Sequence, residues 1–193
     1  MKAKLIFITG NRGKFLEAQK LLKEFGIELE QVDLDITEPQ ADSLEEVVRK
    51  CAEEALKIVK ENFIIDDSGL FIKSLNGFPG VYSSYVYKTI GYKGILKLLS
   101  DLTDRSAYFM TALAYGEPRG ELKIFSGRVD GIITNEARGE NGFGFDPIFK
   151  PLGSNLTFAE MSIEEKNKFS HRAKALRAFA SWFMSKEKNL EQK

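Results

Sequence analysis

An unbroken apolar run near the start of the chain leads through a glycine turn into a helical pattern. The run Leu5-Ile6-Phe7-Ile8 has no polar side chain, and such a strand needs cover on both faces, as in an α/β sheet. After the turn Thr9-Gly10-Asn11-Arg12-Gly13-Lys14, apolar residues recur at helical spacing from Lys14, and Gly26 follows as a C-cap. This order of strand, turn and helix predicts an α/β fold.

The glycine turn over 9–14 is suited to binding an anion. It aims backbone N–H groups and the positive end of the following helix at whatever lies above the sheet. Thr9, Asn11 and Lys14 add a hydroxyl, an amide and an ammonium group. The spacing is neither that of the P-loop nor that of the dinucleotide fingerprint. Glycine and lysine also occur in such turns for steric and capping reasons alone, and this is the alternative.

A second apolar run, Ile64-Ile65, stops at two adjacent carboxylates, Asp66 and Asp67. We expect the chain to turn at Ser68-Gly69, which would place both acids at the end of a strand. Neighbouring carboxylates repel each other, and Mg²⁺ bound by carboxylate oxygens relieves such repulsion where phosphates are the substrate. The alternative is a solvated hairpin turn, which Asp-Ser-Gly also favours.

The composition limits which kinds of partner the chain can bind and which kinds of metal ligand it can offer. With 28 basic and 28 acidic residues among 193, the chain carries no net charge that would attract nucleic acid or an anionic membrane. A single cysteine, Cys51, and a single histidine, His171, exclude an internal disulfide and metal sites built from several thiolates or imidazoles. Oxygen ligands remain. Cys51 lies on the apolar stripe of an expected helix, which indicates packing rather than a nucleophile.

The organisation of the chain predicts one domain over residues 1–185 and a charged, frayed tail over 186–193. Met1-Lys2-Ala3-Lys4 leads into an apolar run too short for a signal sequence, and no stretch approaches a membrane span, so we expect a cytoplasmic protein. Further elements are expected as follows: a strand over 27–34, a helix from a Ser43–Glu46 capping box to about residue 62, a loop over 75–91, a short helix over 92–102, antiparallel strands over 107–115 and 121–129, a further strand at 131–133, and one last helix opened by a Ser162–Glu165 capping box.

The segment 139–149 is rich in glycine and aromatic residues, which suits the wall of a pocket for a flat base. Aromatic rings stack on a base, and glycine lets the backbone come close to it. Asp146 offers an acceptor for hydrogen bonds from a base or a ribose. The alternative is a turn whose phenylalanines point into the core. Lys166, His171 and Arg172 lie on or beside the last helix, where basic residues commonly form a solvated face.

Five motifs in this order resemble the inosine triphosphate pyrophosphatase family. They are T-G-N-R-G-K at 9–14, D-D-S-G-L at 66–70, F-P-G-V-Y-S-S at 78–84, G-F-G-F-D-P-I-F at 142–149 and S-H-R at 170–172. The resemblance implies hydrolysis of the non-standard purine nucleoside triphosphates ITP, dITP and XTP to the monophosphate and pyrophosphate, with Mg²⁺ as cofactor. It also implies an elongated α/β fold with a mixed central sheet flanked by helices, a cleft between two lobes, and a homodimer.

The family's residue roles carry over to matching positions of this sequence. By that resemblance, Asp67 is the catalytic carboxylate and a metal ligand, Glu38 is the second metal ligand, and Ser68 touches the nucleotide. The remaining substrate-binding residues would be Thr9, Gly10, Asn11, Arg12, Gly13 and Lys14 on the triphosphate, Phe143, Gly144, Phe145 and Asp146 around the base, Lys166 towards phosphate, and His171 and Arg172 towards the purine.

A donor from Arg172, protonated His171 or the backbone would accept the carbonyl at position 6 of hypoxanthine or xanthine and leave adenine mismatched. Two alternative functions stay open. A regulatory protein would hold a purine triphosphate without hydrolysing it, and would have little need for Glu38 and the Asp66-Asp67 pair. A related pyrophosphatase would act on other modified nucleotides.

Overall fold

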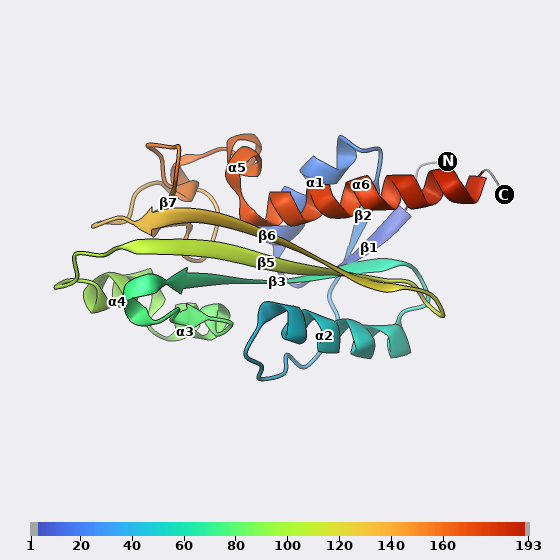
Figure 1. The fold of residues 1–193 in the computed structure, drawn as a ribbon, viewed down its shortest axis with the longest axis horizontal. Helices are drawn as coiled ribbons and strands as arrows, with labels where there is room; N and C mark the ends of the chain where they lie inside the picture. The colour runs from blue at the N-terminus through green and yellow to red at the C-terminus, as the bar shows by residue number, and fades with distance from the viewer. Residues whose placement is uncertain (1–3, 192–193) are drawn as a thin grey trace. The chain divides into compact units, whose positions relative to one another are not determined.

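The structure is a computed structural model that describes residues 4–191. Met1-Lys2-Ala3, considered above for a signal sequence, and residues 192–193 of the expected tail lie outside the described residues. A seven-stranded sheet has the order β2-β1-β3-β5-β6-β7, with β4 paired to β3 (Figure 1). Parallel and antiparallel pairs both occur, and helices flank the sheet, so the expected mixed α/β class is confirmed.

The elements follow one another along the chain with these bounds: β1 Lys4–Ile8, α1 Arg12–Lys23, β2 Glu28–Val32, α2 Leu44–Ile58, β3 Phe63–Ile72, a 3₁₀ turn Lys73–Leu75, β4 Pro79–Gly80, α3 Ser83–Thr89, α4 Gly91–Leu98, β5 Ser106–Gly116, β6 Leu122–Ile133, a 3₁₀ turn Asp146–Ile148, β7 Phe149–Pro151, a 3₁₀ turn Phe158–Glu160, α5 Ile163–Phe169 and α6 His171–Glu191. None of the helices within residues 4–191 has the length and apolar character that crossing a membrane requires.

The chain forms two compact units. The first comprises the chain up to Asp67, Thr111–Gly127 and the chain from Arg172 onward; the second comprises Ser68–Met110 and Arg128–His171. The strands β3, β5 and β6 each contribute residues to both units.

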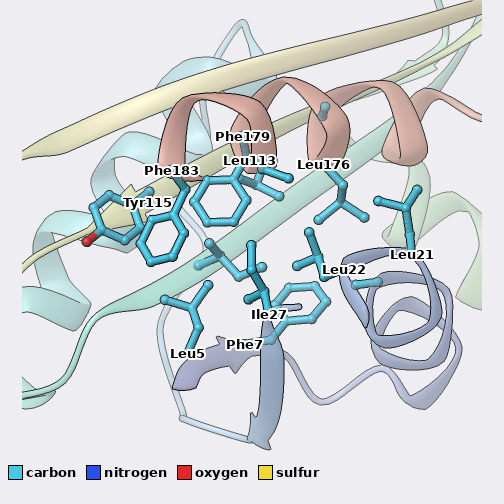
Figure 2. Close-up of a cluster of buried hydrophobic side chains, with 14 of the residues drawn as sticks. Leu5, Phe7, Leu21, Leu22, Ile27, Leu113, Tyr115, Leu176, Phe179 and Phe183 are labelled. Atoms are coloured by element: carbon cyan, nitrogen blue, oxygen red, sulfur yellow. The ribbon is translucent and has the colours of Figure 1, made fainter. Parts of the chain in front are cut away.

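In the first unit, β1 pairs in parallel with both β2 and β3, so that Ile8 lies opposite Val32 on one side and Ile65 on the other. The expected buried strand at 5–8 is thereby confirmed. Side chains from β1, α1 and α6 form one hydrophobic cluster (Figure 2), which includes Leu5, Phe7, Leu21, Leu22, Leu176, Phe179 and Phe183. Each such side chain contributes about 1.5–3 kcal/mol on burial, so this cluster fixes α1 and α6 in place.

In the second unit, β3 pairs antiparallel with β4, and β6 pairs antiparallel with β7. A second hydrophobic cluster joins Leu70 and Ile72 of β3 to Phe109 of β5 and to the segment after β6. Phe145, Phe149 and Phe158 are its contributions from that segment.

The expected turn at Ser68-Gly69 is wrong, because β3 runs without interruption from Phe63 to Ile72. A Cβ on Gly69 would lie 2.4 Å from the carbonyl oxygen of Gly80 on β4. Gly69 therefore marks a close approach of two strands rather than a reversal of the chain. Asp66 and Asp67 lie in mid-strand, and consecutive side chains of a strand point to opposite faces. The sequence analysis expected both acids at the end of a strand, and this expectation is wrong.

The last helix is also different from the prediction. The Ser162–Glu165 capping box is present, but it opens α5, which ends at Phe169. Ser170 is extended (φ −66°, ψ 150°), and α6 begins as a separate helix at His171. Because α6 continues to Glu191, residues 186–191 are helical rather than a frayed tail.

Other element boundaries shift by smaller amounts. α1 begins at Arg12 and is followed by Glu24 as C-cap, so Gly26 is not the cap. The Ser43 hydroxyl caps α2 as expected, but the helix ends at Ile58. The expected loop over 75–91 contains β4 and α3, and the expected strand at 131–133 is the end of β6.

Candidate active site

The turn between β1 and α1 is organised by its own polar side chains. The Asn11 side chain caps α1 by accepting a hydrogen bond from the backbone N–H of Lys14 at 3.1 Å, and the Thr9 hydroxyl accepts one from the N–H of Asn11 at 3.1 Å. A Cβ on Gly10 would lie 2.9 Å from both carboxylate oxygens of Asp33, so the Asp33 side chain would have to shift to make room for one. The N-terminus of α1 therefore has the form of an anion cradle.

Arg12 belongs to the same turn but reaches towards β2. Its guanidinium donates to the side-chain oxygen of Gln31 at 3.1 Å and lies 5.0 Å from the ring centroid of Phe15. The Gln31 amide donates in turn to the carbonyl oxygen of Thr9 at 2.9 Å. Arg12 thus braces the turn, while Gly13 lies in the first turn of α1.

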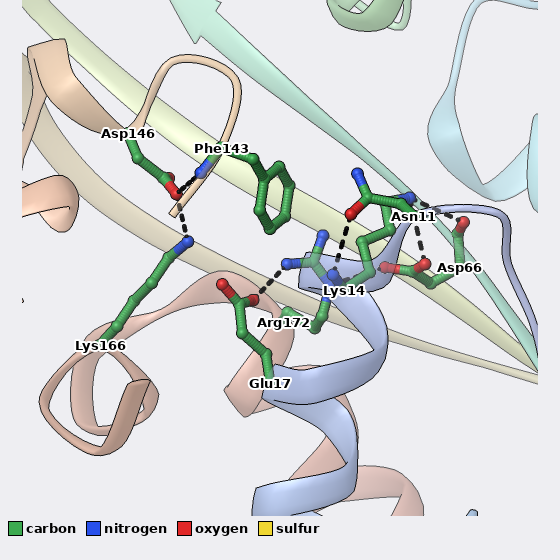
Figure 3. A network of polar contacts seen from close by, with 8 residues as sticks. All are labelled: Asn11, Lys14, Glu17, Asp66, Phe143, Asp146, Lys166 and Arg172. Atoms are coloured by element: carbon green, nitrogen blue, oxygen red, sulfur yellow. Dashed lines mark hydrogen bonds and ion pairs between the residues drawn. The ribbon is translucent and has the colours of Figure 1, made fainter. Parts of the chain in front are cut away.

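Asp66 is the centre of a buried charge network in the first unit (Figure 3). The Lys14 ammonium lies 3.1 Å from the Asp66 Oδ1 atom and donates to the Asp66 carbonyl oxygen at 3.2 Å. The Arg172 Nε–H donates to Asp66 Oδ2 at 2.9 Å, and its Nη1 donates to Glu17 Oε2 at 2.6 Å. The structure therefore brings Lys14 and Arg172 together around Asp66, which the sequence analysis expected beside Asp67 in a pair of acids whose repulsion Mg²⁺ relieves.

The ionisation of this network follows from its pairing. Burial by itself would raise the pKa of Asp66, but the charges of Lys14 and Arg172 and their hydrogen bonds lower it below its ordinary value. Burial would lower the pKa of Arg172, but the carboxylates of Asp66 and Glu17 raise it above its ordinary value. The net shifts in the pKa of Asp66 and of Arg172 therefore both favour the charged forms.

The carboxylate of Asp67 affects the pKa of a different group, the Cys51 thiol of α2. Burial, followed by the carboxylates of Glu38, Asp67 and Glu54, raises the pKa of Cys51 to about 11. A thiol with this pKa is protonated at neutral pH, which agrees with a packing role. The two carboxylates expected to bind metal, Glu38 and Asp67, thus both influence one buried side chain of the first unit.

A metal ion bound by Glu38 and Asp67 would need further oxygen ligands, such as water or phosphate oxygens. Among residues 4–191 there is no group of three or more His, Cys, Asp or Glu side chains placed to hold one. Mg²⁺ is commonly bound by one or two carboxylates together with water and substrate phosphate oxygens. The donor set of Glu38 and Asp67 fits that pattern.

In the second unit, Asp146 and Lys166 form a buried ion pair. The Lys166 ammonium lies 2.6 Å from Asp146 Oδ2, and the same oxygen accepts a hydrogen bond from the backbone N–H of Phe143 at 2.9 Å (Figure 3). Lys166 also lies 4.8 Å from the ring centroid of Phe143. Asp146 and Lys166 therefore hold the loop that presents the Phe143 ring.

The loop that carries Phe143 is glycine-dependent. Gly142 and Gly144 have left-handed φ values of 75° and 63°, and a Cβ on Gly142 would lie 2.1 Å from Asp146 Oδ2. Phe145 is buried in the core of the second unit and makes an edge contact with Tyr87, at 5.5 Å between centroids. The ring of Phe145 therefore packs inward. This agrees, for Phe145, with the alternative in which the phenylalanines of this segment point into the core.

His171 and Ser68 complete the predicted positions in the second unit. The His171 ring is buried and stacked on Phe109, at 4.7 Å between centroids and 10° between planes. Ser68 lies in β3 immediately after Asp67.

Sequence reasoning missed Glu17, which is buried at the far end of the charge network. The signal was present, since Glu17 is an acid on the face of α1 that also carries Ala18 and Leu21. A lone carboxylate on such an apolar face needs a buried cation, because an unpaired buried charge is costly.

Comparison with known proteins places the chain in a family. The profile of the Ham1 family matches residues 5–182. The chain is 55% identical to a dITP/XTP pyrophosphatase of Thermococcus kodakarensis, over 93% of this chain and 96% of that protein. It is 52% identical to a dITP/XTP pyrophosphatase of Methanopyrus kandleri, with the same coverage of both chains.

Solved structures agree with this. The Ham1 protein of Staphylococcus aureus superposes with a TM-score of 0.80 at 30% identity, covering 95% of this chain and 99% of that chain. A nucleoside-triphosphatase / dITP/XTP pyrophosphatase from Mycobacterium abscessus superposes with a TM-score of 0.69 at 34% identity, covering 91% and 98%. The resemblance inferred from five short motifs is confirmed, and the chain belongs to the Ham1 family.

Proposed function

We propose that this protein is a nucleoside triphosphate pyrophosphohydrolase that converts the non-standard purine nucleotides dITP, ITP and XTP to their monophosphates and pyrophosphate. The observation that carries the proposal is the 55% identity, over nearly the whole of both chains, to a relative named for dITP and XTP. The anion cradle at the start of α1 supports it from the chain's own geometry.

In the proposed reaction, the outer phosphates of the substrate bind at the N-terminus of α1 and at the Lys14 ammonium. A triphosphate carries about four negative charges at neutral pH, so it needs positive partners to bind and react. Mg²⁺ held by Glu38 and Asp67 would supply further positive charge to offset that of the phosphates. The helix end, Lys14 and the two carboxylates would then be one binding surface of the first unit.

Asp67 orients a water molecule and accepts its proton as the water oxygen attacks the α-phosphorus. A bond forms between the water oxygen and phosphorus, and the bond from phosphorus to the α–β bridging oxygen breaks. The electron pair of that bond leaves with pyrophosphate, and the nucleoside monophosphate remains. A positioned carboxylate acting on water in this way commonly contributes about 10²–10⁴-fold to the rate.

For the second unit we propose that the Phe143 ring stacks on the purine base. The ring is held by the hydrogen bond from its backbone N–H to Asp146, and a stacked base is tolerant of purine identity. Selection for a carbonyl at position 6 then needs a hydrogen-bond donor. The proposal also takes residues 1–185 as one catalytic domain and includes a homodimer and a cytoplasmic location, as the family resemblance implies.

The test is pyrophosphate release measured in parallel from dITP, ITP, XTP, dGTP and ATP with Mg²⁺. We expect strong release from the first three and little from the last two. Release that is equal for all five would contradict the substrate class. Tight binding of dITP without release from any nucleotide would support the regulatory alternative instead.

A further inference from the structure

Four charged side chains of the first unit form an alternating series: Glu17, Arg172, Asp66 and Lys14, which we call the buried charge series. Each neighbouring pair is in contact, at 2.6 Å between Glu17 and Arg172, 2.9 Å between Arg172 and Asp66, and 3.1 Å between Asp66 and Lys14. The series joins three elements, since Glu17 and Lys14 lie on α1, Asp66 on β3 and Arg172 on α6.

The exposure of the series increases towards Lys14. The side chains of Glu17, Arg172 and Asp66 are 4%, 2% and 0% exposed, whereas that of Lys14 is 17% exposed. Three members are therefore closed off from solvent, and the last presents its ammonium at the anion cradle. A ligand can reach the series only at that end.

Lys14 needs such a partner if it is to bind phosphate with a defined geometry. A lysine side chain has four rotatable bonds and a compact charge, so it does not orient itself as arginine does. Here the ammonium contacts Asp66 twice, at the Oδ1 atom and at the carbonyl oxygen. These two contacts fix where the ammonium lies and leave it a third N–H to donate.

Asp66 in turn needs Arg172, because a carboxylate with no solvent contact is costly unless it is paired and hydrogen-bonded. Arg172 donates to Asp66 and Glu17 from two different nitrogens, which holds the guanidinium between the two acids. The side chain that the family resemblance directs at the purine is thus engaged with two carboxylates of its own unit.

We propose that Asp66 is a positioning residue for the reaction, which holds the Lys14 ammonium against the outer phosphates of the substrate, and that Arg172 and Glu17 keep Asp66 in place. This inference rests on the proposed function. It assigns to the first acid of the Asp66-Asp67 pair a role distinct from that of Asp67. Asp66 acts through Lys14, whereas Asp67 acts on water.

The first test is a double-mutant cycle with Asp66→Asn, Lys14→Gln and the pair, measured as kcat and KM for dITP. A charge-assisted hydrogen bond corresponds to about a 10- to 100-fold effect, so we expect each single change to raise KM by that factor. The pair should raise KM no further than Lys14→Gln alone, because both changes remove the same contact. Effects that multiply would show that Asp66 does not act through Lys14 and would overturn the inference.

Glu117→Gln is the matched control, since it removes the carboxylate of another ion pair of the first unit, with Lys186. We expect it to leave kcat and KM unchanged. A rise in KM there equal to that of Asp66→Asn would mean that loss of any ion pair has this effect, and would overturn the inference.

The second test measures binding without turnover. Calorimetry with inorganic tripolyphosphate and Mg²⁺ should show about a 10- to 100-fold weaker affinity for Asp66→Asn and for Lys14→Gln. Asp67→Asn should weaken it less than Asp66→Asn does. Unchanged tripolyphosphate affinity in a folded Asp66→Asn protein would refute the positioning role.

If Asp66→Asn does not fold, Glu17→Gln replaces it as the test variant. This substitution keeps an oxygen acceptor for Arg172 and leaves Asp66 intact. We expect a smaller rise in KM, about threefold, that disappears in the Lys14→Gln background. A rise that persists in that background would overturn the inference. If the wild-type protein released no pyrophosphate from dITP, the proposed function would fail, while the tripolyphosphate measurement would still decide the role of Asp66.

Discussion

Asp66 and Asp67 are neighbours in sequence, yet their carboxylates lie on opposite faces of β3. Asp66 pairs with Lys14 and Arg172, whereas Asp67 acts with Glu38 on the thiol of Cys51. The cause is that β3 does not turn at these residues, so consecutive side chains point to opposite faces of the strand. Asp66 is thereby neutralised by two cations of its own unit.

Asp67→Asn tests the proposed role of Asp67 as the group that accepts a proton from the attacking water. We expect kcat for dITP to fall by about 10²–10⁴-fold, because an amide cannot accept the proton of the attacking water. Binding of dITP, measured by calorimetry, should survive. A variant that retains wild-type kcat would remove Asp67 from the proposed mechanism.

Removal of the metal should stop the reaction. We expect EDTA to abolish pyrophosphate release, and added Mg²⁺ to restore it. Glu38→Gln should shift the Mg²⁺ concentration for half-maximal activity upward by about tenfold or more, since it removes one of two charged ligands.

Glu54→Gln is the matched control for this measurement, because Glu54 also influences Cys51 but has no assigned ligand role. Its Mg²⁺ dependence should match that of the wild type. If Glu38→Gln and Glu54→Gln gave the same curve, Glu38 would not be a specific ligand.

Phe143 and Phe145 should respond differently to the same substitution. Phe143→Ala should raise KM for dITP about tenfold with little loss of stability, because a stacking contact with a base is worth about 1–3 kcal/mol. Phe145→Ala should lower the free energy of unfolding by about 3 kcal/mol, because its ring is buried in the second hydrophobic cluster. Steady-state kinetics and chemical denaturation distinguish the two, and equal effects on KM would contradict the assignment.

The decrease in the free energy of unfolding at acid pH should depend in part on Glu117. A hydrogen bond from Lys186 lowers the pKa of Glu117 below its ordinary value. Since the pKa is lower in the folded state, the pair stabilises the protein above the unfolded pKa of about 4.3 and loses that effect as pH falls through the folded value. Glu117→Gln should cost no more than about 1 kcal/mol at pH 7, because the pair is partly exposed.

The measurement is the free energy of unfolding between pH 7 and pH 2. The difference between wild type and Glu117→Gln should shrink as the pH falls and vanish at the acid end. A difference that stays constant over this range would show that the ion pair contributes nothing.

Local patterns in the sequence were sufficient for the elements whose cause is local. The run at 5–8 is a buried strand because four consecutive apolar side chains can be covered only in a two-sided sheet, and β1 lies between β2 and β3. The Ser43 and Ser162 caps follow from side chains that bond to a backbone three residues away. The motif order was sufficient for membership of the Ham1 family.

The predictions failed where a distant segment decides the local conformation. Ser68-Gly69 is a turn signal in isolation, but at Gly69 the approaching backbone of Gly80 explains the glycine and the strand continues. Ser170 separates α5 from α6, although the apolar spacing runs on past it.

The sequence by itself determined the α/β class, the strand, turn and helix at the start of the chain, and the family, because each can be recognised from short motifs whose residues are near one another in the chain. Only the tertiary structure decided which cations pair with Asp66, because Arg172 lies 106 positions away in the chain, on α6. A single buried acid in the sequence is enough to predict that a positive partner lies beside it. The identity of that counter-charge depends on how the chain folds back on itself.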